Sequence, residues 1–253
     1  MKETRAYFDK KGIAAARLDA ELLLAHVLNK DRVQLYLDYN CPVTVDELGR
    51  YRELVKRRAA REPVAYITGI KEFWSIELGV SPAVLIPRPD TEVLVERAVA
   101  LLVDGASTKL HLRVLDIGTG SGALAVALAR ELTTVSVVGL DVSPGALAVA
   151  QRNINACGLQ DRVQLVCGNA TASLKPMAEF DIIIANPPYV CTGDLERLEP
   201  EVADYEPRSA LDGGADGLRF YRSWIPGLPE FLCRDGHVLF EIGCDQGAAV
   251  SDL

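Results

Sequence analysis

The stretch Asn-Pro-Pro-Tyr at residues 186–189 combines groups that could hold a planar amino group. It directly follows the apolar run 182–185, which predicts a buried strand. Because a proline comes next, the Asn186 backbone is biased toward extended geometry and its amide projects from the strand end. Asn186 Oδ1 and the Pro187 carbonyl could then accept both hydrogens of one –NH₂ group, with the Tyr189 ring packed on its face.

Such a clamp would assist a nitrogen that is a poor nucleophile. The lone pair of a planar amide or aryl amine is delocalised, and its hydrogens become more acidic as the nitrogen attacks. Hydrogen bonds to the clamp therefore strengthen in the transition state, and a nitrogen held about 3 Å from an electrophilic methyl gains from proximity. We predict that Asn186, Pro187 and Tyr189 are catalytic and that they bind substrate together with Pro188. Asn186 is also predicted to contact the cofactor. The alternative is an ordinary turn.

A glycine-rich turn joins a predicted strand to a predicted helix in the segment VLDIGTGSGALAVALA, residues 114–129. Gly118, Gly120 and Gly122 permit a tight turn and close approach of a ligand to the backbone, and Thr119 and Ser121 lie between them. The spacing G-x-G-x-G differs from the G-x-G-x-x-G of dinucleotide-binding turns.

The polar residues around this turn indicate its ligand. Asp116 precedes the glycines and suits a cationic amine, whereas Asp141 ends the next predicted strand and could accept hydrogen bonds from ribose hydroxyls. Asn169 follows the third strand and could bind an adenine edge or serve only in a turn. Together they predict S-adenosylmethionine as the cofactor and S-adenosylhomocysteine as its product. The alternative is that the glycines serve only helix–strand packing.

The elements that position these residues begin at Arg113. From there, near-continuous apolar strands alternate with amphipathic helices, which predicts an α/β fold with a doubly wound parallel sheet covered on both faces. Ligands of such sheets bind beyond the carboxyl ends of the strands, where the glycine turn, Asp141 and Asn186 all fall.

The preceding part of the chain has a different character. Residues 1–62 predict a small helical domain, in which Thr44 and Glu47 form a capping box. In its segment 17–28 an apolar stripe is expected at Leu18, Leu22, Ala25 and Leu28, with the acids elsewhere. Alternation over 64–87 predicts a β-hairpin within a linker, residues 63–88. A helix over 91–103, capped by Asp90, is expected to open the third region, residues 89–253.

Composition excludes several functional classes. The net charge of −8 argues against direct binding of nucleic acid, and no apolar run reaches the ~20 residues of a membrane helix. The start of the chain lacks a secretory signal, so we expect a cytoplasmic protein. With three histidines and no C-x₂-C pair, no metal site is expected.

Four segments, taken in order, resemble the bacterial release factor glutamine methyltransferases, the PrmC/HemK family. They are PVAYITGIKEFWSIELGVSPAVLIPRPDTE, VLDIGTGSGALAVALA, NPPYV and YEPRSALDGGADGLRFYR. NPPY alone marks amino methyltransferases in general, whereas IPRPDTE and EPRSALDGG are much narrower. The resemblance spans nearly the whole chain and implies a Rossmann-like class I S-adenosylmethionine-dependent methyltransferase domain with a helical N-terminal domain.

The resemblance also implies an activity, namely N5-methylation of the glutamine in the Gly-Gly-Gln motif of class 1 peptide chain release factors. It assigns the cofactor loop to 118–122, a further cofactor contact to Asn169 or Ala170, and the clamp to 186–189. It places Arg88, Pro89, Asp90 and Glu92 at the edge of the site, where they are expected to support the loop around the methionine moiety. Arg88 is also expected to bind substrate. A linker turn with a helix cap is the alternative for these four residues.

Other hypotheses remain open. A DNA adenine-N6 methyltransferase would share the clamp but would need a basic recognition region, and a non-catalytic S-adenosylmethionine-binding scaffold would not need the clamp. We expect a monomer. Members of the family usually continue past residue 253, so the last strands of the sheet are expected to be missing. Basic residues of the helical domain form either a docking surface for the protein substrate or a solvated face; they are Arg50, Arg52, Lys56, Arg57, Arg58 and Arg61.

Overall fold

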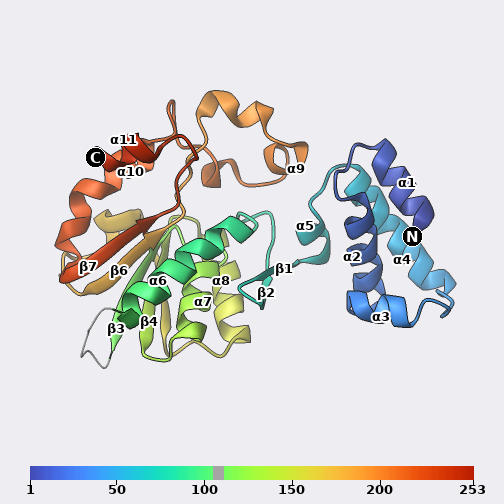
Figure 1. Ribbon diagram of the computed structural model, residues 1–253, viewed down its shortest axis with the longest axis horizontal. Coiled ribbons are helices and arrows are strands. Elements are labelled where there is room, and N and C mark those ends of the chain that lie inside the picture. The colour runs from blue at the N-terminus through green and yellow to red at the C-terminus, as the bar shows by residue number, and fades with distance from the viewer. Residues whose placement is uncertain (105–110) are drawn as a thin grey trace. The chain divides into compact units, whose positions relative to one another are not determined.

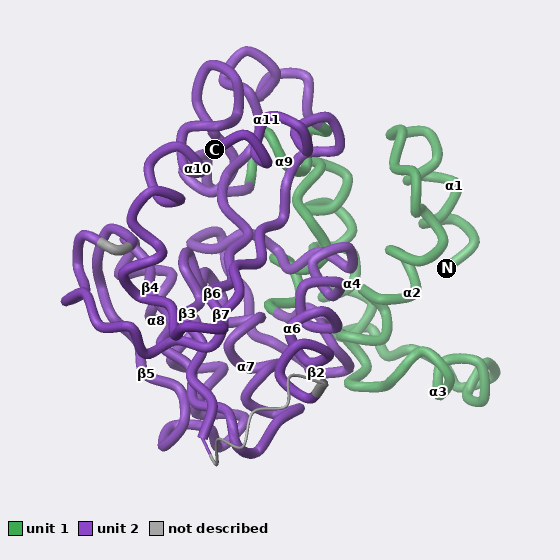
Figure 2. The backbone as a smooth tube through the Cα atoms, turned by 60° about the vertical axis from the view of Figure 1, so that its left-hand side comes forward, with its two compact units in different colours: residues 1–69, 199–205 green, residues 70–198, 206–253 purple. Residues whose placement is uncertain are grey.

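A computed structural model describes residues 1–104 and 111–253 of the chain. The chain forms two compact units, one of residues 1–69 with 199–205 and the other of residues 70–198 with 206–253 (Figure 2). No helix within the described ranges is long and apolar enough to cross a membrane.

The first unit is helical. Its helices are α1 (Lys2–Lys10), α2 (Ala16–Leu28), α3 (Arg32–Leu37), α4 (Val45–Ala59), α5 (Val64–Thr68) and the short α9 (Pro200–Ala203). The predicted capping box at the start of α4 is confirmed: Glu47 N–H donates to Thr44 Oγ1 and Thr44 N–H donates to Glu47 Oε2.

The apolar stripe expected on α2 is half right. Ala25 is buried in the core of the unit and Leu28 packs against it, but Leu18 is 40% exposed and Leu22 is only partly buried. Other residues of the helix that face the core are Ala20, Leu23, Leu24 and Val27. Two acids of this helix, Asp19 and Glu21, are also buried. Their burial is possible because arginines pair with both carboxylates, which compensates for the loss of water.

Ion pairs bind the segment 199–205 to the rest of the first unit. Arg58 of α4 lies between two carboxylates: Nε donates to Asp19 Oδ2 at 2.7 Å and Nη2 donates to Glu201 Oε1 at 2.7 Å. Arg61 donates to Glu201 Oε2 from Nη2 at 2.5 Å. Burial acts to raise the pKa of Glu201, but these arginines hold that pKa below its usual value. For Asp19, burial raises the pKa even though Arg58 opposes the shift.

The second unit is built on a parallel sheet of five strands, in the order β5-β4-β3-β6-β7 (Figure 1). These strands are β3 (Leu112–Ile117), β4 (Val135–Asp141), β5 (Val163–Cys167), β6 (Phe180–Ala185) and β7 (Leu232–Phe240). The helices are α6 (Glu92–Asp104), α7 (Ala123–Glu131), α8 (Pro144–Ala156), α10 (Arg219–Trp224) and α11 (Gly247–Ser251). The predicted α/β fold with a parallel sheet is confirmed.

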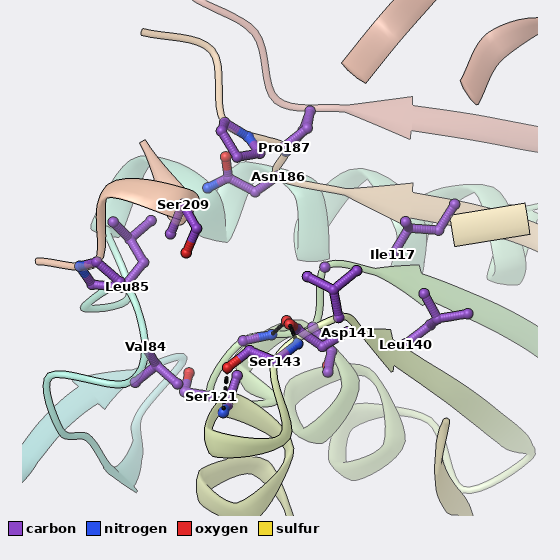
Figure 3. Close-up of a pocket in the computed structure, with 18 of the residues that line it drawn as sticks. Val84, Leu85, Ile117, Ser121, Leu140, Asp141, Ser143, Asn186, Pro187 and Ser209 are labelled. Carbon is purple, nitrogen blue, oxygen red and sulfur yellow. Dashed lines mark hydrogen bonds between the residues drawn. The ribbon is translucent and has the colours of Figure 1, made fainter. Parts of the chain in front are cut away.

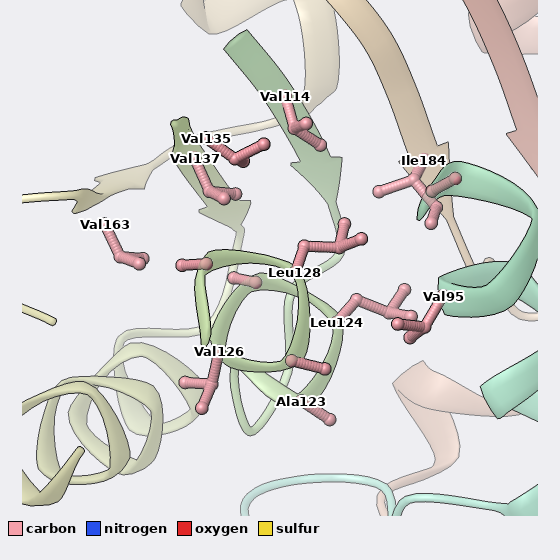
Figure 4. Packing of buried hydrophobic residues seen from close by; sticks show 14 of the residues in the cluster. Val95, Val114, Ala123, Leu124, Val126, Leu128, Val135, Val137, Val163 and Ile184 are labelled. Atoms are coloured by element: carbon pink, nitrogen blue, oxygen red, sulfur yellow. The ribbon is translucent and has the colours of Figure 1, made fainter. Parts of the chain in front are cut away.

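Alternate residues of the strands pack into two cores, one on each face of the sheet. On one face, Val114 and Ile184 join α6, α7 and part of α8; Figure 4 shows Leu124 and Leu128 on the side of α7 toward Val95 and Ile184. On the opposite face, Leu115 and Ile183 pack with Trp224 of α10 and with the turn that follows it. Neighbouring side chains of a strand point to opposite faces of the sheet. Continuous apolar strands therefore correctly predicted a sheet that is covered on both faces.

The region before α6 differs from the sequence prediction. The hairpin is limited to β1 (Ile70–Phe73) and β2 (Ile76–Gly79), and residues 64–68 form the helix α5 instead of strand. A 3₁₀ turn over Pro89–Thr91 precedes α6, and Asp90 lies inside that turn, whose N-cap is Arg88, so the predicted cap position is wrong. Proline at the start of that turn presets its φ angle, which lets the chain turn without a side-chain cap.

Candidate active site

A cavity lies at the carboxyl ends of the parallel strands of the second unit. Figure 3 shows Asn186 and Pro187 on one side of it, and Ser121, Asp141 and Ser143 on the opposite side. Apolar side chains, among them Val84, Leu85 and Leu140, complete the walls together with residues of the segment 207–210. The sequence predicted this edge of the sheet, but it did not predict that Ser209 and Phe220 would line the same cavity.

The glycine turn forms the floor of the cavity. Gly118, Gly120 and Gly122 all have positive φ, at 75°, 56° and 79°, a conformation that other residues adopt only with strain. The N–H groups of Gly118 and Thr119 both donate to the carbonyl of Leu140, at 2.7 and 3.0 Å. A side chain at position 122 would approach the Ala150 Cβ to 3.2 Å, so this glycine also allows α7 and α8 to pack closely.

Asp141 connects the glycine turn to the start of α8. Its Oδ2 accepts from Gly120 N–H and its Oδ1 accepts from Ser143 N–H, both at 2.9 Å. The carboxylate lines the cavity, and each oxygen keeps a second lone pair for a ligand. The structure therefore places Asp141 where a pair of ribose hydroxyls could be held.

Asp116 lies behind the glycine turn and is not among the residues that line the cavity. Thr119 Oγ1 donates to its Oδ2 at 2.6 Å, while Oδ1 is buried without a hydrogen-bond partner among the described residues. Burial raises the pKa of Asp116 to about 7, and the nearby charge of Asp141 acts in the same direction. Because one oxygen of this buried carboxyl group lacks a partner, a cation close to the turn would stabilise its charged form.

This raised pKa predicts a pH dependence of stability. Below about pH 4 Asp116 is protonated in both states; as the pH rises toward 7, the unfolded chain releases this proton while the folded chain keeps it. Asp116 therefore lowers the free energy of unfolding progressively between about pH 4 and pH 7, with no further change above that range.

We expect Asp116→Asn to remove this contribution. The measurement is urea unfolding of wild type and variant across that pH range, with Asp161→Asn as a control that removes one exposed carboxylate. A difference in unfolding free energy between Asp116→Asn and wild type that stays constant with pH would contradict the shift.

Gly168, Asn169 and Ala170 line the cavity after β5. Ala170 is buried and has a φ of 45°, and Asn169 N–H donates to Ser173 Oγ at 2.7 Å, so this turn is fixed locally. Both residues proposed from the sequence for a cofactor contact thus border the same cavity as Asp141.

The clamp residues occupy the side of the cavity opposite the glycine turn. Asn186, Pro187 and Pro188 line it, whereas Tyr189 does not. The Tyr189 hydroxyl instead donates to Glu241 Oε1 at 3.4 Å, and burial, followed by the charge of Glu241, raises the pKa of this tyrosine. Asn186 Nδ2 donates to Thr91 Oγ1 at 3.1 Å.

Thr91 and Glu241 were missed by the sequence reasoning. Thr91 lines the cavity, and its hydroxyl donates to Glu241 Oε2 at 2.6 Å. A signal for Glu241 existed, since it directly follows the apolar residues 238–240, and Asp141 and Asn186 also stand at the ends of apolar runs. No comparable signal marked Thr91, which lies in the turn before α6.

The four residues predicted at the edge of the site separate in the structure. Arg88 lines the cavity, and its Nη2 donates to Glu206 Oε1 at 2.6 Å. Pro89 and Asp90 are exposed and are not among the lining residues. Glu92 contributes elsewhere, because its Oε1 accepts from Trp74 N–H in the tight turn of the hairpin, where Trp74 and Ser75 have positive φ.

Comparisons with known proteins give matches for both parts of the chain. Residues 1–69 match the family model described as PrmC N-terminal domain, and residues 92–198 match that of the methyltransferase small domain. The hMettl16 catalytic domain, solved in complex with the MAT2A 3′UTR hairpin 6, shares the fold at a TM-score of 0.55 and 16% identity, over 79% of this chain and 72% of that one.

Curated relatives match over almost the full chain. The release factor glutamine methyltransferase of Geobacter sulfurreducens is 48% identical over 249 residues, which cover 98% of this chain and 84% of that protein. The protein of the same name from Chlorobaculum tepidum is 39% identical, over 100% of this chain and 87% of its own length. The chain therefore belongs to the release factor glutamine methyltransferase family and is a methyltransferase.

Proposed function

We propose that this protein transfers a methyl group from S-adenosylmethionine to the side-chain amide nitrogen, N5, of the glutamine in the Gly-Gly-Gln motif of class 1 peptide chain release factors. The observation that carries the proposal is that Asn186 and Pro187 face the glycine turn and Asp141 across one cavity (Figure 3). An amino group held by the former would meet a cofactor held by the latter.

The residues present fit S-adenosylmethionine. Asp141 would accept from the ribose hydroxyls, Asn169 and Ala170 border the space for the adenine, and the backbone at 118–122 would contact the amino-acid portion. Asp116 lies behind the turn with one oxygen that has no partner among the described residues, and its carboxylate would compensate the positive charge of the cofactor's amine. Among the described residues no cluster of His, Cys, Asp or Glu could hold a metal ion.

The chemistry proposed is a direct in-line transfer. S-adenosylmethionine supplies a methyl group on a sulfonium sulfur, so that the N–C bond forms as the S–C bond breaks and S-adenosylhomocysteine leaves as a neutral thioether. Asn186 Oδ1 and the Pro187 carbonyl would hold the two hydrogens of the glutamine amide and stabilise positive charge as it develops on the nitrogen. One of these hydrogens is then lost as a proton, which restores a neutral amide.

The test is to incubate the purified protein with labelled S-adenosylmethionine and either an intact release factor or unmethylated DNA, and to locate the label by mass spectrometry. We expect a methyl group on the Gly-Gly-Gln glutamine. Label in adenine would retain the clamp chemistry and overturn the substrate. Cofactor binding without transfer to either substrate would favour the non-catalytic scaffold.

We further propose that the helical unit docks the protein substrate through the exposed part of α4. Arg58 is buried and Arg57 pairs with Glu62, so these residues serve the unit itself. Arg50 and Arg52, by contrast, are exposed on the same helix and suit an acidic partner surface.

Reversing both charges, with Arg50→Glu and Arg52→Glu, should raise the KM for an intact release factor roughly tenfold. A short Gly-Gly-Gln peptide, which lacks the rest of the release factor, should show an unchanged KM. The matched control is Lys10→Glu with Lys11→Glu, the same change of charge on exposed residues of the same unit. Equal effects of the two double variants would reject a specific docking role for α4.

A further inference from the structure

We propose that Glu241 and Thr91 are positioning residues that fix the orientation of the Asn186 amide, so that its oxygen and not its nitrogen faces the reacting amino group. This inference rests on the proposed function, because it concerns how the clamp selects a nitrogen that carries two hydrogens.

The sheet brings Glu241 to the clamp. Phe240, the last residue of β7, pairs with Ala185, the last residue of β6. Glu241 N–H then donates to the carbonyl of Ala185 at 3.0 Å, which continues the ladder by one residue and sets Glu241 beside Asn186. From the other side, Tyr221 OH donates to the Glu241 carbonyl at 2.7 Å. The backbone of Glu241 is therefore held at both its polar groups.

The hydrogen bonds that join Glu241, Thr91 and Asn186 run in one direction. Thr91 Oγ1 donates to Glu241 Oε2 at 2.6 Å, which uses the single hydrogen of the threonine hydroxyl. Thr91 Oγ1 can then only accept from its other neighbour, the Asn186 amide at 3.1 Å. That neighbour must be Nδ2, which leaves Oδ1 as the group that is free to accept.

The burial of Thr91 makes these hydrogen bonds fix the orientation of the Asn186 amide. Thr91 is 5% exposed, so water cannot readily replace either of its bonds. If the Asn186 amide rotated by half a turn, Oδ1 would face a hydroxyl oxygen that has no hydrogen to offer, and a buried acceptor would be left unpaired. The same rotation would turn Nδ2 toward the substrate and replace an acceptor by a donor.

The clamp orientation has a consequence for specificity. Because Nδ2 is engaged by Thr91, Oδ1 is the atom of the Asn186 amide left to accept from a ligand. A glutamine amide would then meet an acceptor for its hydrogens, whereas a glutamate carboxylate at the same place would meet the oxygens of Asn186 and Pro187 and be repelled. Glu241 also accepts from Tyr189 OH, so a single carboxylate contacts both the aromatic residue of the clamp and the threonine that orients its amide.

The experiment compares Thr91→Val, which keeps the shape but removes the hydroxyl, with Thr91→Ser, which keeps the hydroxyl. We expect Thr91→Val to lower kcat roughly tenfold, with cofactor affinity unchanged, and Thr91→Ser to retain most of the activity. Glu241→Gln should fall between them, because its amide can either accept from Thr91 or donate to it. Thr192→Val is the control, since Thr192 Oγ1 donates to a carboxylate, that of Asp212, but does not line the cavity.

A second readout separates orientation from general loosening. Binding of a Gly-Gly-Gln peptide and of its Gly-Gly-Glu counterpart is measured for each variant by competition. In Thr91→Val the ratio of the affinity for the glutamine peptide to that for the glutamate peptide should fall roughly tenfold, because the Asn186 amide can rotate. In Thr91→Ser this ratio should stay at the wild-type value. Wild-type kcat and preference in Thr91→Val, or equal losses in the valine and serine variants, would overturn the proposal.

The two proposals fail in distinguishable ways. If the wild-type protein methylates an amino group other than glutamine N5, the proposed substrate fails, and the Thr91 variants are compared on that amino group instead. If the wild-type protein methylates glutamine and Thr91→Val behaves like the Thr192→Val control, the orientation proposal fails alone.

Discussion

Asn186→Ala should slow methyl transfer by about 10² to 10³ while leaving cofactor binding intact. The substitution removes Oδ1, one of two acceptors whose hydrogen bonds to the substrate amide strengthen as charge develops on its nitrogen. Loss of one such hydrogen-bonding group typically lowers kcat by about 10² to 10³. The cofactor is held across the cavity by the glycine turn and Asp141, so its dissociation constant should change by less than about twofold. Single-turnover methylation and calorimetric titration with S-adenosylhomocysteine measure the two quantities.

The matched control is Asn155→Ala, which removes an exposed amide on α8 that bonds only to Gln151 among the described residues. It should leave both quantities at the wild-type level. Equal methylation rates in wild type and Asn186→Ala would contradict the clamp mechanism. If the rate and the cofactor affinity fell together, Asn186 would act mainly on the cofactor.

Arg58→Ala should destabilise the helical unit by about 3–5 kcal/mol, the usual cost of removing one partner from a buried ion pair. Asp19 and Glu201 would lose the guanidinium between them, and only Arg61 would remain to pair with Glu201. Both tryptophans, Trp74 and Trp224, belong to the other unit, so tryptophan fluorescence follows that unit while far-ultraviolet circular dichroism also follows the helices of the first.

In urea, the variant should therefore lose part of its helical signal at a lower denaturant concentration than wild type, ahead of the fluorescence transition. Arg57→Ala is the control on the same helix, because its pair with Glu62 is exposed and should contribute only about 0–1 kcal/mol. If the two variants unfold alike, the ion pairs around Arg58 do not stabilise the unit.

Together these predictions separate two uses of charge in one chain. Around Arg58, carboxylates and guanidinium groups neutralise one another and fix a short segment, 199–205, within the helical unit. Around the cavity, Asp141 and Glu241 instead organise neighbouring polar groups and keep them oriented toward the space where the reaction is proposed. The first use is tested by stability and the second by rate and affinity.

The sequence by itself determined the sheet and its edge. Continuous apolar strands can be satisfied only when both faces are covered, and parallel strands align their carboxyl ends, so the turns after 117, 141, 167 and 185 had to meet. The glycine turn, Asp141 and the clamp could be assigned for this reason, because each depends on local geometry at the end of a strand.

Only the tertiary structure decided the partners of individual side chains. Asp19 and Glu21 looked like solvent-facing acids because hydrophobic periodicity treats every charge as exposed, yet long-range arginines make their burial possible. Glu92 was assigned to the site and instead bonds to the hairpin turn, whereas Thr91, its neighbour, reaches Asn186, 95 residues away in the sequence. Hydrogen bonds of that kind depend on where the folded chain brings distant residues together, and no local pattern records them.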